Sequence, residues 1–196
     1  TQYMVRAAKI ETTASGSWWN LSLGAQATAP ASGPVLVNVD MLLEGPYDQV
    51  SGQMNDDLRA AGLIPLTEPY TALGYAQVGG GGGETVAQSI LNVTGANAVV
   101  DWVRVELRSS STPATVLATK QGLLQRDGDV IATDGSSPLS FNVGAGNYHV
   151  AIRHRNHLGA MTSSPVALNG IAATVNFKGT SLTTYGTEAE KTIGTA

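Results

Sequence analysis

The chain has 196 residues, 13% of them charged, and a formal net charge of −4 at pH 7. That length suffices for one β domain with a buried core, or for a domain and an arm. Acids and bases are scattered without a basic patch, which argues against a nucleic-acid partner. No apolar run approaches the roughly 18–20 residues of a membrane-spanning helix. The absence of cysteine excludes disulfides, thiol chemistry and cysteine-ligated zinc.

Residues 1–33 differ from the rest of the chain. Two β-like pieces, Tyr3–Glu11 and Ser17–Leu23, precede a linker-like stretch rich in Ala, Thr and Pro. Alternation with a period of 2 places apolar side chains on one face of each piece. These side chains are Met4, Ala8, Ile10, Trp19, Leu21 and Leu23. Two interpretations stay open: first strands of the main domain, or an extended arm that adds a strand to a neighbouring subunit.

Residues 34–178 indicate an all-β domain with a jelly-roll-like antiparallel β-sandwich fold. The predicted strands are Val35–Glu44, Glu84–Thr94, Ala98–Arg108, Ala114–Leu124, Leu139–Val143, Tyr148–Arg155, Met161–Leu168 and Ile171–Phe177. Ala98–Arg108 is the clearest, because large side chains on both of its faces place it centrally. Gly122 suggests a β-bulge in the strand that follows. Residues 179–196 read as a polar C-terminal tail.

The segment Met54–Thr85 interrupts this pattern as one long loop. It has neither a strand period nor a sustained helical period, yet it is too apolar for a solvated loop. We expect a short helical turn near its start and an extended path at Pro65 and Pro69. The five glycines Gly79–Gly83 lack the following Lys-Ser/Thr of a phosphate-binding loop. The segment is therefore predicted to be an ordered apolar cover over the sandwich, with glycines that allow either tight backbone turns or close packing against another chain.

An acidic cluster formed by Asp127, Asp129 and Asp134 is the one candidate metal site of this kind. Short carboxylates in Asp-Gly-rich loops bind calcium, and Asp-Gly is equally the usual signal of a hairpin turn. The spacing lacks the terminal glutamate of a complete calcium loop. The cluster is thus interpreted as plain turns, with calcium, the only cofactor considered, as the alternative.

All three histidines, His149, His154 and His157, lie in or just after one predicted strand. They either form a polar network with nearby arginines and acids or hold a metal ion, although adjacent arginines would repel a cation. Asn20 and Asn92 match the acceptor pattern for N-linked glycans. No nucleophile–base pair accompanies these residues, so an enzyme is not expected.

Several sequence blocks together resemble a known module. They are residues 42–47, 54–75, 79–85, 99–108, 114–130, 137–141 and 148–161. In this order they resemble a β-sandwich module found toward the C-terminal part of large secreted bacterial surface proteins. The resemblance spans about residues 35–190 and not residues 1–33. It implies an exported module without enzymatic activity, and it supplies no catalytic residues.

An isolated module with a strand-like arm is also similar to subunits of arm-exchanging extracellular filaments. The prediction is a secreted or cell-surface structural protein, a subunit of a pilus-like filament. It would self-assemble by inserting its arm, as a donor strand, into the next copy. The alternative is an adhesin or carbohydrate-binding module that presents Trp18, Trp19, Tyr47 and Tyr70 to surface glycans. The chain begins at Thr1 without a signal peptide, which leaves open a processed terminus or a shortened start.

Overall fold

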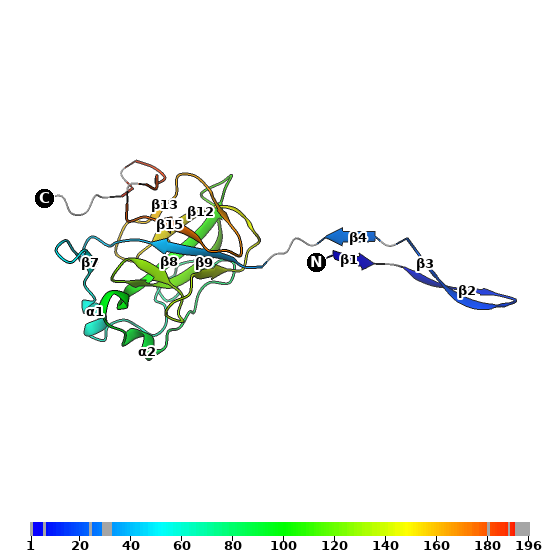
Figure 1. Cartoon of the computed structure of the whole chain (residues 1–196), viewed down its shortest axis with the longest axis horizontal. Helices are drawn as coiled ribbons and strands as arrows, with labels where there is room; N and C mark the ends of the chain where they lie inside the picture. Colours follow the sequence, from blue (N-terminus) through cyan, green and yellow to red (C-terminus); the bar gives the residue numbers. More distant parts are fainter. Residues whose placement is uncertain are drawn as a thin grey trace. The chain divides into compact units, whose positions relative to one another are not determined.

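The computed structural model describes residues 2–5, 7–23, 25–28, 33–179, 181–187 and 189–190. The chain divides into two units, Thr1–Ser32 and Gly33–Ala196, which we call the N-terminal hairpin and the sheet domain (Figure 1). The all-β prediction is confirmed at the level of a mostly β fold with one large, predominantly antiparallel sheet and few short helices. The pairing of the described strands does not close into a barrel.

The N-terminal hairpin consists of two consecutive antiparallel ladders. Strand β1 (Gln2–Val5) pairs with β4 (Ala25–Thr28), and β2 (Ala8–Thr13) pairs with β3 (Gly16–Leu21). The Ser22 N–H donates to the carbonyl of Ala7 at 2.9 Å and links the two ladders. The turn follows Thr13, where Gly16 adopts a φ of +139° that favours glycine. The second part of the first β-like piece is therefore the partner of the second piece, whereas its start pairs with β4 in the stretch predicted to be linker-like.

The sheet domain is built on a nine-stranded sheet with the order β11-β5-β10-β9-β8-β12-β13, in which β14 also pairs with β12 and β15 pairs with β5. All pairs are antiparallel except β15 with β5. The bounds are β5 (Val35–Asp40), β8 (Val99–Ser109), β9 (Val116–Gln125), β10 (Asp129–Ile131), β11 (Leu139–Phe141), β12 (Gly146–Arg153), β13 (Ala160–Met161), β14 (Val166–Leu168) and β15 (Ala173–Asn176). Outside it lie a small ladder of β6 (Tyr47–Asp48) with β7 (Gln53–Met54), the helices α1 (Asp57–Ala60) and α2 (Gln88–Leu91), and a 3₁₀ turn at Gly95–Asn97.

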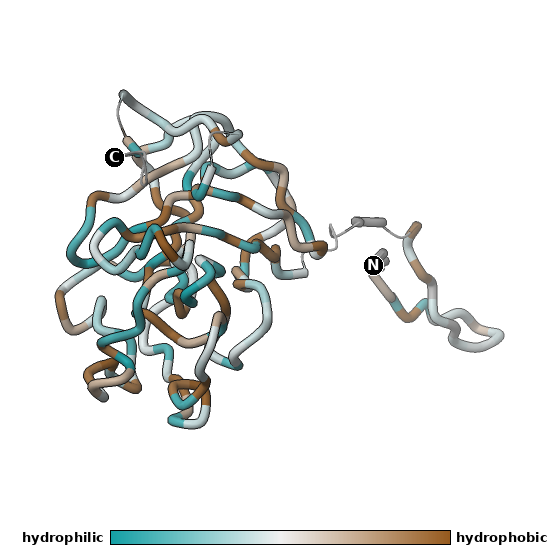
Figure 2. The backbone as a smooth tube through the Cα atoms, turned by 60° about the vertical axis from the view of Figure 1, so that its left-hand side comes forward, coloured by the Kyte–Doolittle hydropathy of each residue, from teal (hydrophilic) through white to brown (hydrophobic). Residues whose placement is uncertain are grey.

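The larger core lies on the inner face of the curved sheet. Alternation places every second residue of β5, β8 and β12 there. The fully buried members are Val35, Val37, Val39, Val103, Val105, Leu107, Val150 and Ile152. The Leu36 N–H donates to the carbonyl of Asn169, just after β14, so the two halves of the sheet approach each other. Figure 2 shows apolar stretches alternating with polar ones along the chain of this domain.

A second, smaller core lies on the outer face of β8 and β9, beneath the segment Met54–Thr85. Tyr70 and Ile64 of this segment pack with Trp102 and Leu123 of the sheet. The Tyr70 hydroxyl donates to the carbonyl of Trp102 at 2.9 Å, and the Trp102 indole N–H donates to the carbonyl of Pro65 at 2.8 Å. The prediction of an ordered apolar cover is confirmed.

Gly79 and Gly81 of the glycine run pack against β9 of the same chain, and four of the five glycines adopt the positive φ of tight turns, as one of the two interpretations predicted. A Cβ atom built on Gly81 would lie 2.1 Å from the Thr119 carbonyl oxygen. Gly79, with a φ of +65°, would place one 2.8 Å from the Leu117 carbonyl oxygen. Only glycine lets the cover approach the strand this closely.

Three local predictions were wrong. The predicted strand Met161–Leu168 is two short strands, β13 and β14, which pair with different parts of β12. The predicted strand Glu84–Thr94 is a loop with the short helix α2, because Val86, Ile90 and Leu91 pack on the second core at a helical spacing. Gly122 does not form a bulge, since it stays in register opposite Val103. Its missing side chain instead leaves room for β10 and β11, whose nearest atoms would lie 2.9–3.0 Å from a Cβ.

Candidate functional site

The N-terminal hairpin carries an exposed apolar face. Ala8, Ile10, Leu21 and Trp19 share this face, with Ile10 directly opposite Trp19 and Ala8 opposite Leu21. Ile10 is 52% exposed, Leu21 53% and Trp19 66%. Beyond β3, Leu23 is almost fully exposed. These large apolar side chains could therefore be buried by contact with another protein surface.

The remaining predicted contact, Met4, lies in β1 opposite Gln26. Its side chain lies outside the part of the structure that is described, as do the side chains of Trp18 and the candidate glycan acceptor Asn20. The other candidate acceptor, Asn92, is exposed at the C-terminal end of α2, where its side-chain oxygen accepts a 3.1 Å hydrogen bond from Gln88.

The acidic cluster does not assemble a calcium site. Asp127 accepts a hydrogen bond from the N–H of Asp129, and Asp134 accepts from the N–H groups of two serines that follow it, so both shape turns. The ammonium group of Lys178 lies 3.4 Å from Asp129. Among the described residues, no group of three or more His, Asp or Glu is placed to hold a metal ion. The physical reason is that these carboxylates are engaged with their own backbone and with a lysine.

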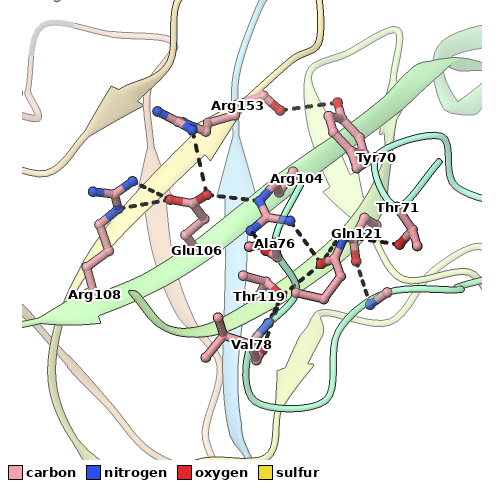
Figure 3. Close-up of polar contacts among 12 residues, drawn as sticks. Tyr70, Thr71, Ala76, Val78, Arg104, Glu106, Arg108, Thr119, Gln121 and Arg153 are labelled. Carbon is pink, nitrogen blue, oxygen red and sulfur yellow. Dashed lines mark hydrogen bonds and ion pairs between the residues drawn. The ribbon is translucent and has the colours of Figure 1, made fainter. Parts of the chain in front are cut away.

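A polar layer lies on the outer face of β8, beside the second core (Figure 3). Glu106, which is 2% exposed, accepts hydrogen bonds from Arg104 at 2.9 Å and from Arg108 at 2.5 Å, and Arg153 lies 4.0 Å away. Burial raises the pKa of Glu106, but the hydrogen bonds and charges of these arginines outweigh it and hold the pKa below its usual value. Because the charge of Glu106 is already balanced by the arginines, we interpret this polar layer as a structural part of the sheet.

The cover is tied into this layer by Gln77. Its side-chain oxygen accepts hydrogen bonds from Arg104 at 2.9 Å, Gln121 at 2.8 Å and Thr119 at 3.0 Å. The Arg104 guanidinium also donates to the carbonyl of Ala76. The segment that covers the outer face is therefore fixed by directed hydrogen bonds as well as by apolar packing.

A pocket of about 320 Å³ opens at one end of the sheet domain. It lies where β5 and β12 end and β8 begins. We call it the end pocket, and its lining is Leu43, Gly45, Pro46, Asn55, Asp57, Leu58, Val100, Asp101, His154, Asn156 and His157. Its volume is near the lower limit of ligand pockets, about 300 Å³. A single ring or side chain is the size of group that it accommodates.

Three side chains of the end pocket form a chain of hydrogen bonds. His154 Nε2 lies 3.0 Å from Asp101 Oδ2, and Arg155 donates to Asp101 Oδ1 at 2.7 Å. His154 Nδ1 lies 2.9 Å from His157 Nδ1 and accepts from the Asn156 N–H. Asp101 is buried, which raises its pKa, but the hydrogen bonds from His154 and Arg155 outweigh burial and lower it. Asp101 is therefore an acceptor throughout the neutral range.

This series of hydrogen bonds assigns the tautomer of each imidazole. An ionised Asp101 requires the proton of His154 on Nε2, and the Asn156 N–H requires a lone pair on Nδ1. We assign His157 as a donor through Nδ1 that shares this lone pair with the Asn156 N–H, which leaves Nε2 of a neutral His157 as an acceptor. Burial, followed by the adjacent His154, lowers the pKa of His157, and this favours the neutral form.

The sequence grouped all three histidines with arginines and acids, and the structure brings two of them, His154 and His157, together with Asp101 and Arg155. His149 lies apart, with Nδ1 2.8 Å from the carbonyl of Thr162. Sequence reasoning did not find the pocket, because its other walls come from residues before and after β6 and β7. Of the predicted aromatic platform, Tyr70 is fully buried and Tyr47 packs against the larger core.

No known family model matches the chain, and no curated protein or solved structure matches it. The resemblance to secreted bacterial surface modules therefore stays a prediction. Within the described part of the chain, no helix has the length and apolar character needed to cross a membrane.

Proposed function

We propose that this protein is a structural subunit of an extracellular filament and that it self-assembles through its N-terminal hairpin. The observation that carries the proposal is the exposed face of Ile10, Trp19 and Leu21 on a unit separate from the sheet domain. An isolated two-stranded hairpin is marginally stable in water. Full burial of each large apolar side chain contributes about 1.5–3 kcal/mol, so binding to a neighbour stabilises both the hairpin and the assembly.

In this proposal the arm adds to the sheet of its neighbour, but as a hairpin and not as a single strand. Because β2 and β3 pair with each other, the arm reaches its neighbour as a two-stranded unit. The outer edge of β2 or β3 then supplies main-chain hydrogen bonds to a strand of the next copy, as in strand addition. Each such hydrogen bond adds about 1 kcal/mol net, and the alternating side chains set the register.

Three further predictions belong to this proposal. The finer fold, a jelly-roll-like sandwich, is supported by the single core shared between β5 and the β8–β12 half of the sheet. Export to the cell surface is supported by the low charge and the 23 glycines. The main partner is a second copy of the same chain.

Electron microscopy of three proteins tests the proposal. The full chain should form filaments, whereas a chain without residues 1–32 and an Ile10→Ser/Trp19→Ser variant should remain single particles. Val50→Ser is the matched control, because Val50 is 96% exposed on the sheet domain and lies outside the hairpin. Filaments that persist without the hairpin, or a full chain that never assembles, would refute the proposal. Circular dichroism verifies that the shortened chain keeps its sheet.

A second function, adhesion to surface glycans, is favoured by the exposed indole of Trp19. Glycan binding that is lost in Trp19→Ala while assembly is unchanged would support it. Tyr70 contributes nothing to such a surface, since its side chain is fully buried.

A further inference from the structure

The end pocket has the chemistry of a receptor for an aromatic side chain with one hydrogen-bond donor. Its apolar walls include Leu43, Leu58 and Val100, and the residues shown to line it include no aromatic ring apart from the two imidazoles. Its polar lining includes two acceptors, the carboxylate of Asp57 and Nε2 of the neutral His157, beside the side-chain amides of Asn55 and Asn156. A fitting occupant therefore brings an apolar ring and an N–H or O–H of its own.

Trp19 is such a group on the same chain. It is 66% exposed on the apolar face of the N-terminal hairpin, and tryptophan carries one ring N–H donor. Buried indole N–H groups require an acceptor. The cavity of about 320 Å³ has room for one such ring.

The surroundings of both partners are also complementary. Ile10 lies directly across from Trp19, and Leu21 is two residues along β3 on the same face. On the side of the pocket, Leu58 is 37% exposed and Leu158, adjacent to His157 in sequence, is 96% exposed. Apolar residues around a central aromatic anchor exclude water from it, as in interfaces between proteins.

We propose that the end pocket of one copy of this chain receives Trp19 from the N-terminal hairpin of a second copy. The proposal rests on the proposed function and deepens it, because it names the surface that the hairpin binds. The indole N–H donates to Nε2 of His157, which the hydrogen bonds through His154 to Asp101 hold in the accepting tautomer. The ring contacts Leu43, Leu58 and Val100.

Mixed-chain cross-linking tests the contact directly, because the chain contains no cysteine. One protein carries Ser17→Cys, on the same face of β3 as Trp19, and the other carries Asn156→Cys, on the pocket lining. A short bis-maleimide should join them into a covalent heterodimer. The control replaces Asn156→Cys with Ser111→Cys, near the opposite end of β8, roughly 25 Å or more from Asp101 along the strand. A heterodimer with the control pair alone, or with neither pair, would overturn the proposal.

Affinity measurements by sedimentation give an independent readout. Trp19→Phe keeps a ring and loses the N–H donor, so the dissociation constant should rise about 5–10-fold. His157→Ala should have a similar effect, and the double variant should be no worse than either single change. Additive effects would show that Trp19 and His157 do not touch.

The outcomes separate this inference from the proposed function. A full chain that is monomeric at every concentration refutes both. A chain that assembles through its hairpin, but without cross-linking to Asn156→Cys and without a response to His157→Ala, refutes the pocket as the receptor and leaves the function standing. A glycan that occupies the pocket while assembly proceeds unchanged refutes the pocket proposal in the same way. A bis-maleimide cross-link within single chains that carry both cysteines, without any between mixed chains, shows binding within one chain and refutes the second copy as partner.

Discussion

His154 Nε2 donates a 3.0 Å hydrogen bond to Oδ2 of Asp101, and both side chains are almost completely buried. With Arg155 on the other oxygen at 2.7 Å, the carboxylate organises the loop after β12 around the end pocket. A buried charge held in this way stabilises the fold only while its partners remain, because an unmatched buried charge is costly.

Asp101→Asn should lower the free energy of unfolding by about 2–4 kcal/mol at pH 7. Burial raises the pKa of Asp101, but hydrogen bonds from His154 and Arg155 lower it below the unfolded value of about 3.9. The stabilisation is therefore present above about pH 4 and is lost as the pH falls through the lower, folded value. Urea unfolding at neutral and acidic pH checks this, with the exposed Asp57→Asn as control. Equal stability of wild type and Asp101→Asn at pH 7 would contradict the prediction.

Glu106→Gln should destabilise the protein by about 3–5 kcal/mol, because it leaves the buried Arg104 without its anionic partner. Arg153→Gln is the control within the same layer. Its side chain is 47% exposed and lies 4.0 Å from Glu106, so its loss should cost less than about 1 kcal/mol. Chemical denaturation measures both, and a cost for Arg153→Gln as large as that for Glu106→Gln would refute this ranking.

Gly81→Ala should detach part of the cover from β9. The new methyl group would lie 2.1 Å from the Thr119 carbonyl oxygen, so backbone must move. We expect a loss of about 2–3 kcal/mol or more, together with faster hydrogen exchange of the Thr119 N–H, which donates to the carbonyl of Val78. Gly144→Ala, with no atom within 4 Å of the new group, should change stability by less than about 0.5 kcal/mol. Unchanged exchange in Gly81→Ala would disprove the close approach.

Self-association should weaken as the pH falls. Burial and the adjacent His154 lower the pKa of His157, while Glu44 and Asp101 oppose the shift. His157 is thus neutral at pH 7, and a pH well below its ordinary value of about 6.5 protonates Nε2 and removes the acceptor for Trp19. The dissociation constant measured by sedimentation should rise between neutral pH and about pH 5. His157→Ala should abolish that dependence on pH, and a variant that retains the full dependence would exclude His157 as its source.

Much of the sheet could be predicted from the sequence, because alternation is a local property. The alternating valines of β5, and the large side chains on both faces of β8, identify these as buried strands without any knowledge of their partners. The segment Glu84–Thr94 could not be assigned, since Val86, Ile90 and Leu91 fit a strand or a helix until the second core selects one. The pairing of β2 with β3 was also missed, although the intervening Thr-Thr-Ala-Ser-Gly is a plain turn.

The end pocket could not be predicted from the sequence, for a different reason. Asp101 and His154 are 53 residues apart, and their contact depends on β8 and β12 being neighbours in the sheet. The sequence shows the spacing of His154 and His157. It does not show that one imidazole fixes the tautomer of the other. In the acidic loop the sequence left turns and calcium open, and the carboxylates of Asp127 and Asp134 serve the turns.

Sedimentation velocity of the full chain, over a wide range of concentration at neutral pH, is the most direct test of assembly through the hairpin. The account predicts a weight-average mass that exceeds the monomer mass and grows with concentration, and a constant monomer mass for Ile10→Ser/Trp19→Ser. A full chain that stays monomeric at every concentration, or a variant that associates as strongly as the wild type, would contradict it.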